Sequence, residues 1–94
     1  MSSEEPTPPV PIPITGELDL HTFRPAEIPS LLDTYFDACR RRGLREVRVV
    51  HGKGTGTLRT TVHAHLRRSH GVLGYRMGDE HTGGWGATLV TLRP

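Results

Sequence analysis

The sequence has few residues that could form the disulfides or zinc sites that stabilise small domains, since it contains one cysteine, Cys39, among 94 residues. A single cysteine cannot form an internal disulfide, and no cysteine pair offers zinc ligands. Aromatic residues make up only 5% of the chain, and its N-terminal stretch holds no apolar run long enough for a signal peptide or a membrane span. The composition therefore excludes a disulfide-stapled secreted scaffold, predicts no membrane association and indicates the reducing cytoplasm.

Acidic residues are scarce in the middle of the chain. Between residues 40 and 76 there are ten basic residues and one acidic residue, Glu46, an imbalance hidden by the overall charge of +2. Such a block favours an anionic partner, and a nucleic-acid backbone is the most economical one. A solvated basic face is the alternative, but the overlap of the block with a glycine-rich segment favours a functional role.

Proline is concentrated at one end. Five of the eight prolines lie in the first sixteen residues, together with two acidic residues and no basic one. Because proline fixes φ and lacks a backbone donor, residues 1–16 are predicted to form a proline-rich disordered arm of extended, polyproline-like character. The folded domain is predicted to span residues 17–94, near the lower size limit for a single hydrophobic core.

Hydrophobic periodicity predicts four strands and two helices. The first helix carries a continuous apolar stripe, begins near Pro25 with a turn distorted by Pro29, becomes regular near Ser30 and ends at Gly43. The order βαβαββ predicts an α/β fold, a two-layer α+β sandwich with a four-stranded mixed sheet and two helices on one face. The other predicted elements are strands over 17–21, 45–50, 72–77 and 86–92 and a second helix over 57–69.

The predicted topology brings two histidines to one edge of the sheet. A strand–helix–strand unit within one sheet is a right-handed parallel crossover, so the carboxyl ends of the first two strands lie at the same edge. His21 ends the first predicted strand and His51 ends the second. Ligands of open α/β sheets bind at such an edge, where loops and helix N-termini converge.

The segment HGKGTG, residues 51–56, follows the second predicted strand and has the composition of an anion cradle. Its glycines let the backbone approach a ligand, the first turn of the next helix offers amide groups and the positive end of a dipole, and Lys53 adds a charge. Thr55 or Thr57 could cap that helix or donate a hydroxyl. The predicted phosphate-binding residues are His51, Gly52, Lys53, Gly54, Thr55, Gly56 and Arg59.

The glycine spacing fits neither familiar nucleotide-binding pattern. A phosphate-binding NTPase loop needs four residues between its first glycine and Gly-Lys-Ser/Thr, and the dinucleotide fingerprint needs GxGxxG. On glycines alone, a flexible strand-to-helix turn and an anion site are equally supported. The neighbouring His51, Lys53 and basic residues favour the anion site, with a phosphodiester as its ligand.

Asp19 and His21 form a second constellation, since both lie on the strand face opposite Leu18 and Leu20. A carboxylate beside an imidazole fixes its tautomer and suits it to acid or base work, so Asp19, His21 and His51 are predicted as catalytic residues for phosphodiester cleavage. Residue types alone favour a structural role for Asp19, as an acceptor for neighbouring loops. No cofactor is required, and a divalent metal is compatible with these residues although no tight ligand pattern occurs.

The remaining chemistry-bearing residues are predicted to be structural. His63, His65 and His70 lie on or just after the second helix, with His65 near its apolar stripe. His81 lies in a predicted loop. Trp85 could stack on a base, but a lone tryptophan beside a strand is more often part of the core.

Three segments together resemble the small MutS-related (Smr) domain family. They are LDLH at 18–21, HGKGTG at 51–56 preceded by REVRVV, and GGWGATLV at 83–90, and the resemblance covers residues 17–94. It implies a fold similar to the C-terminal domain of bacterial translation initiation factor three, in agreement with the order of elements. The family's LDxH motif, associated with cleavage, falls on Leu18, Asp19 and His21, and its HGxG motif, associated with substrate binding, falls on His51, Gly52 and Gly54.

The resemblance implies an endonuclease acting on DNA or RNA, in DNA repair or recombination or in ribosome rescue. One departure is Thr22, where the family commonly has a glycine. No MutS-type ATPase accompanies the domain, so a short stand-alone member is expected, with nucleic acid and the ribosome as candidate partners. A non-catalytic nucleic-acid-binding or ribosome-binding module is the alternative, and an enzyme for a small phosphorylated metabolite is a third hypothesis.

Overall fold

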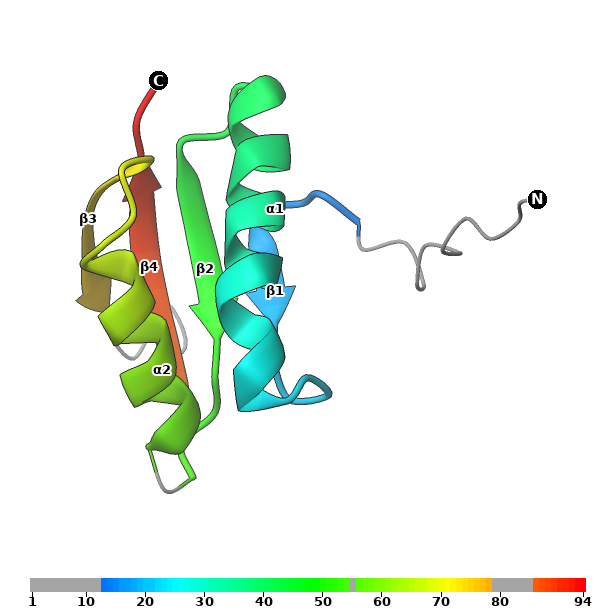
Figure 1. Cartoon of the computed structure of the whole chain (residues 1–94). Coiled ribbons are helices and arrows are strands. Elements are labelled where there is room, and N and C mark those ends of the chain that lie inside the picture. The colour runs from blue at the N-terminus through cyan, green and yellow to red at the C-terminus, as the bar shows by residue number, and fades with distance from the viewer. Residues whose placement is uncertain (1–12, 55, 79–85) are drawn as a thin grey trace.

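The structure, a computed structural model, describes residues 13–54, 56–78 and 86–94 and has two helices on one face of a four-stranded sheet (Figure 1). The arm up to residue 12 and the predicted positions Thr55, His81 and Trp85 lie outside the described residues. The order of elements confirms the predicted two-layer sandwich. The elements are β1 (Glu17–Asp19), the 3₁₀ turn η1 (Pro25–Glu27), α1 (Ile28–Arg41), β2 (Glu46–Val50), α2 (Thr57–Leu66), β3 (Val72–Met77) and β4 (Ala87–Leu92).

The sheet has the strand order β1-β2-β4-β3. Strand β1 runs parallel to β2, with Asp19 paired to Val50, whereas β2 and β3 both run antiparallel to β4. Leu20 extends the parallel ladder by donating its N–H to the carbonyl of Val50 at 2.8 Å. The carboxyl ends of β1 and β2 therefore share one edge, as predicted, and α2 begins at that edge (Figure 1).

The first helix starts with a distorted turn at Pro25, as predicted, but its regular part begins two residues earlier than predicted. A 3₁₀ turn from Pro25 to Glu27 forms the distorted start, and α1 is regular from Ile28 rather than Ser30. Pro29 occupies the first turn of α1, where backbone N–H groups have no partner within the helix, so its missing donor costs little. Gly43 follows the helix with φ +80°, the left-handed conformation predicted for it.

The second helix begins at Thr57, as predicted, but ends earlier than predicted. It stops at Leu66 rather than residue 69, because the next turn tightens: Arg68 N–H donates to His65 O and Ser69 N–H to Leu66 O, three residues back. Its N-cap is Gly56 with φ +90°, so Thr57 is the first helical residue rather than the predicted cap.

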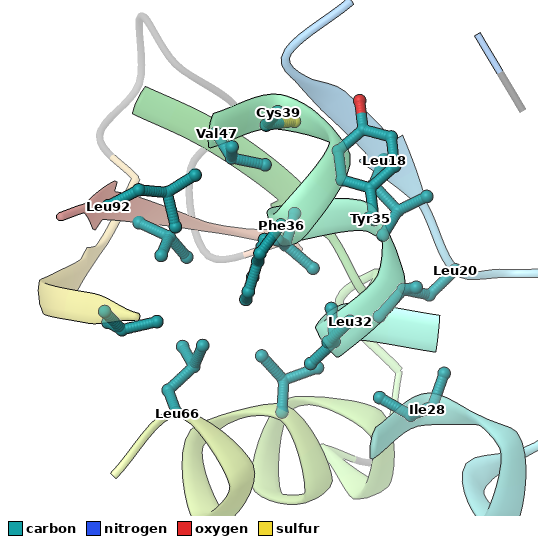
Figure 2. Close-up of a cluster of buried hydrophobic side chains, with 14 residues drawn as sticks. Leu18, Leu20, Ile28, Leu32, Tyr35, Phe36, Cys39, Val47, Leu66 and Leu92 are labelled. Carbon is teal, nitrogen blue, oxygen red and sulfur yellow. The ribbon is translucent and has the colours of Figure 1, made fainter. Parts of the chain in front are cut away.

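The core lies between the two helices and the sheet (Figure 2). The apolar stripe of α1 is buried as predicted, apart from the half-buried Leu31, and the free Cys39 lies within it. Among the described residues, no helix is long and apolar enough to cross a bilayer. The buried apolar residues are Leu18, Leu20, Ile28, Leu32, Tyr35, Phe36, Cys39, Val47, Val49, Val62, Leu66, Val72, Ala87, Val90 and Leu92.

Candidate functional site

Asp19 and His21 form a hydrogen-bonded pair at the end of β1. One carboxylate oxygen of Asp19, Oδ1, accepts the backbone N–H of His21 at 3.0 Å and its ring Nδ1–H at 2.8 Å. Both side chains are exposed, His21 by 73% and Asp19 by 52%. Since a carboxylate can only accept, neutral His21 carries its proton on Nδ1. Nε2, which keeps its lone pair, is then the basic atom of an exposed ring.

The same contacts keep Asp19 ionised. The backbone N–H of His21 lowers the pKa of Asp19 most, the ring N–H of His21 lowers it further, and the charge of Arg48 acts in the same direction. Arg48 lies across the sheet in an ion pair with Glu17 at 2.6 Å. Asp19 is therefore an anion throughout the neutral range, and it orients the imidazole of His21 rather than exchanging protons with solvent.

His51 is placed very differently, because its side chain is only 5% exposed. Its Nδ1 lies 3.1 Å from the carbonyl of Gly52, and its Nε2 lies 2.8 Å from the hydroxyl of Thr88 on β4. A carbonyl cannot donate, so Nδ1 carries the proton and Nε2 of the neutral ring accepts the hydroxyl hydrogen. Both ring nitrogens of His51 are thus engaged inside the protein.

The hydroxyl of Thr88 joins His51 to a second histidine. Thr88 is fully buried, and its Oγ1 also lies 2.8 Å from Nε2 of His63 on α2. A hydroxyl has one hydrogen, already donated to His51, so His63 must donate Nε2–H to Thr88. The result is a directional chain from His63 through Thr88 to His51 and on to the carbonyl of Gly52. The ring of Tyr75 packs against His63, with centroids 4.9 Å apart.

Both histidines of this chain favour the neutral form. Burial lowers the pKa of His51 most, the hydrogen bond to the Gly52 carbonyl partly opposes this effect, and the charge of Arg59 lowers the pKa further. Burial also lowers the pKa of His63, aided by His51, Arg59 and Arg67. The neutral tautomers required by the hydrogen bonds are therefore those the surroundings stabilise.

This preference predicts loss of stability in mild acid. Below the ordinary histidine pKa of 6.5 the unfolded chain binds protons that the folded His51 and His63 resist, so the free energy of unfolding falls as the pH drops below that value. The stabilising contribution of ionised Asp19 is also lost on acidification, but only as the pH falls through 3.8 and below. Urea unfolding at pH 7.5 and 5.5 should show the decrease, and His63→Gln should reduce it.

His70→Gln, which alters an exposed histidine outside the chain of hydrogen bonds, is the matched control for this measurement. An equal pH dependence in wild type and His63→Gln would contradict the assignment of a neutral, buried His63.

The glycine-rich loop is anchored to the start of β4. The carbonyl of Gly86 accepts the N–H groups of both His51 and Gly52 at 2.9 Å. The amide of Gly52 is therefore directed into the protein, and an amide cradle for an anion would begin at Lys53. Gly52 has φ +84°, which lets the chain turn from β2 into the loop.

Two cations accompany the loop. Lys53 is exposed. Arg59 lies in the first turn of α2, and its guanidinium is next to Gly56, the N-cap residue. A cation at a helix N-terminus opposes the helix dipole, so Arg59 is not placed there for the stability of α2. Its position supports the prediction that this end of the molecule receives an anion.

The predicted catalytic residues thus fall into two groups at one edge of the sheet. Asp19 ends β1 on the helix-free face and His21 lies two residues further on, whereas His51 points to the helix-covered side with Val47 and Val49. The charges that shift their pKa values also differ: His21 and Arg48 act on Asp19, whereas Arg59 acts on His51. Over the described ranges, no group of three His, Cys, Asp or Glu side chains is arranged to hold a metal ion.

Sequence analysis missed Thr88, and it treated His63 only as a structural residue. A signal for Thr88 was present, because it occupies an inward position of a strand whose other inward residues are Val90 and Leu92. A buried polar side chain at such a position needs a hydrogen-bond partner, and the partner can only come from another element.

Comparison with known proteins assigns the family. Residues 18–93 match the family profile described as Smr domain. The chain belongs to the Smr domain family. Across 79 residues it is 44% identical to endonuclease MutS2 of Thermomicrobium roseum and across 80 residues 40% identical to that of Clostridium tetani. These matches cover 84% and 85% of this chain but 10% of each relative, so the chain corresponds to about a tenth of the length of those proteins.

Solved Smr structures agree with the fold. The Smr domain of Thermus thermophilus MutS2 superimposes with a TM-score of 0.80 at 38% identity, covering 85% of this chain and 100% of that one. YdaL, a stand-alone small MutS-related protein from Escherichia coli, gives a TM-score of 0.77 at 28% identity, covering 84% of this chain and 65% of that one. The Smr fold therefore accounts for the arrangement of β1, β2 and the glycine loop around one edge.

Proposed function

We propose that this Smr domain is an endonuclease that cleaves phosphodiester bonds of DNA or RNA, using the edge formed by the ends of β1 and β2. The observation that carries the proposal is the Asp19–His21 pair, an exposed imidazole held in one tautomer by an ionised carboxylate 2.8 Å away. The relatives bear the name endonuclease, and this pair lies in their matched region. We place the activity in the cytoplasm, with nucleic acid, free or on the ribosome, as the partner.

His21 acts as the proton-transfer group of this proposal. Nε2 removes the proton from the attacking water, or from a ribose hydroxyl in RNA, as its oxygen forms a bond to phosphorus, while Asp19 holds Nδ1–H and stabilises the imidazolium that forms. The scissile P–O bond breaks, and the leaving oxygen takes a proton from solvent. This general base catalysis contributes about 10²- to 10⁴-fold to a rate. Thr22 stands directly after His21 and is exposed, so the turn accepts a side chain where the family commonly has a glycine.

The loop supplies the positive potential of the proposed site. Lys53 and Arg59 flank the first turn of α2, where the helix dipole adds about half a positive charge. Cations fixed near the scissile phosphate stabilise the charge that grows on its oxygens in the transition state. His51 contributes by holding the loop to Thr88 rather than by meeting the substrate, since both of its ring nitrogens are engaged.

Incubation of the purified protein with labelled single-stranded RNA, duplex DNA and branched DNA, with and without a chelator, tests the proposal. Products that disappear in His21→Ala support it, and the chelator arms show whether a divalent ion takes part. Products that persist unchanged in both His21→Ala and Asp19→Ala would contradict it, because they would come from another enzyme.

A non-catalytic nucleic-acid-binding module is the second candidate, favoured by the burial of His51. His51 was predicted to transfer a proton, and as a buried structural residue it would not be accessible to a substrate. This candidate predicts binding that weakens with salt and with Lys53→Ala, while no product forms on any nucleic acid under any metal condition.

Alanine substitutions at two glycines of the loop distinguish an effect on stability from an effect on binding. Gly52 needs its positive φ, so Gly52→Ala is expected to lower the free energy of unfolding by about 1–2 kcal/mol. Gly54 has no positive φ, and a Cβ on it would meet no atom within 4 Å, so Gly54→Ala is expected to leave stability nearly unchanged. If a phosphate approaches the loop at Gly54, this variant weakens oligonucleotide binding all the same.

Chemical unfolding and fluorescence anisotropy with a labelled oligonucleotide measure the two effects. The interpretation of Gly54 as a point of close approach would be wrong if Gly54→Ala bound the oligonucleotide as tightly as wild type.

A further inference from the structure

A basic groove lies at the far end of α2 from the glycine loop. It encloses about 360 Å³ and lies between the last turn of α2, the start of β3 and the end of β4. The chain passes from α2 into β3 at this end, close to the C-terminus (Figure 1). The groove residues used in this argument are Arg67, Arg68, His70, Leu73, Tyr75 and Arg93.

Among the described residues, no carboxylate side chain lines this groove. Ion pairs in the described part of the chain join His21, Arg41, Arg48 and His65 to carboxylates, and none involves Arg67, Arg68 or Arg93. The side chain of Arg93 donates to a backbone carbonyl, that of His70, and Arg40 approaches from α1 to donate to the carbonyl of Arg93 at 3.3 Å. The helix dipole explains a cation such as Arg67 at the end of α2, but it does not explain Arg93, which comes from β4.

One side of α2 connects the groove to the glycine loop. Arg59, His63 and Arg67 follow one another at intervals of four residues, so they lie on one face of the helix. His63 contacts Tyr75 of β3, so this face is turned toward β3, whereas His65 is turned toward α1 through its contact with Asp33. Tyr75 in turn lines the groove. We call this face, on which the cations Arg59 and Arg67 lie on either side of the neutral His63, the basic flank of α2.

We propose that a nucleic-acid strand follows the basic flank of α2, and that the groove binds backbone phosphates away from the cleaved bond. This inference rests on the proposed function, because the strand begins at the glycine loop. A helix of ten residues is about 15 Å long, and phosphates of one duplex strand advance about 3.4 Å each, so the groove lies about four to five nucleotides from the loop. The exposed side chain of Leu73 and the half-buried Tyr75 border this path.

Two double variants with the same change in net charge test the groove. Arg67→Ala/Arg68→Ala removes two of its cations, and Arg41→Ala/Arg76→Ala removes two exposed cations outside it, Arg41 being paired with Asp37 on α1. Binding to a 4-nucleotide and a 16-nucleotide single-stranded probe is measured by fluorescence anisotropy over a range of salt concentrations. Thermal unfolding of all three proteins confirms that each is folded.

The groove variant is expected to lose about tenfold in affinity for the long probe, and its salt slope should fall by about 1.4, since each lost single-strand phosphate contact contributes about 0.7. Its affinity for the short probe should match that of wild type. An equal loss of affinity in the two double variants, or an equal loss on both probes, would contradict phosphate binding by the groove and leave the proposed function standing. Failure of wild type to bind either probe would overturn the proposed function together with the groove.

Discussion

Replacement of His21 by alanine is expected to slow cleavage by about 10²- to 10⁴-fold while the fold is retained. The range is that of a lost general base, and His21 is the imidazole whose basic nitrogen is both exposed and fixed in tautomer. Because its side chain is 73% exposed, its removal leaves no cavity and should change the unfolding free energy little. Single-turnover cleavage of a labelled substrate, with protein in excess, measures the chemical step without product release.

Asp19→Asn provides the sharper form of this experiment. Asparagine keeps the shape of Asp19 and can still accept from His21, but it removes the charge that stabilises an imidazolium, so the rate should fall while binding is kept. Asp37→Asn is the matched control, since Asp37 is also an exposed aspartate, paired with Arg41 on the surface of α1. Equal rates in Asp19→Asn, Asp37→Asn and wild type would remove the Asp19–His21 pair from the mechanism.

Much of the fold was predictable because its signals are local. The apolar stripe of α1 repeats at helical spacing, and the alternation at Leu18 and Leu20 assigns the inner face of β1. The parallel direction of two strands joined by a crossover helix then places the ends of β1 and β2 at one edge before any contact is known. The end of α2 was missed because it depends on a change from four-residue to three-residue hydrogen bonds, aided by Ser69 Oγ, which donates to His65 O.

The candidate site was predictable only in part, for the same reason. The pairing of Asp19 with His21 depends on residues two positions apart, and sequence spacing captures it. The surroundings of His51 depend on Thr88, 37 residues away, and no local pattern reveals that the imidazole turns inward. The family motif HGxG therefore marks a residue whose contacts in this structure are structural, while its neighbours Lys53 and Gly54 face solvent.

Replacement of Thr88 by valine is expected to have the largest effect on stability among the polar substitutions discussed. Valine preserves the shape of Thr88 but removes the hydroxyl that serves as hydrogen donor to His51 and acceptor for His63. A buried polar atom left without a partner costs about 1–3 kcal/mol, and most of this cost should come from His51, since His63 can turn toward water. Urea unfolding at pH 7.5 measures the loss.

Thr88→Ser is the control that assigns this loss to the hydroxyl, because serine keeps the hydrogen bonds and removes one methyl group, worth about 0.8 kcal/mol. Nitrogen-15 NMR of the imidazoles separates the two variants: His51 should stay protonated at Nδ1 in Thr88→Ser and lose its single tautomer in Thr88→Val. A valine variant that kept this tautomer and full stability would show that Thr88 does not hold His51. Because His51 begins the glycine loop, the same variant should also weaken oligonucleotide binding, and the hydroxyl of Thr88 would then be what links the buried core to the proposed phosphate site.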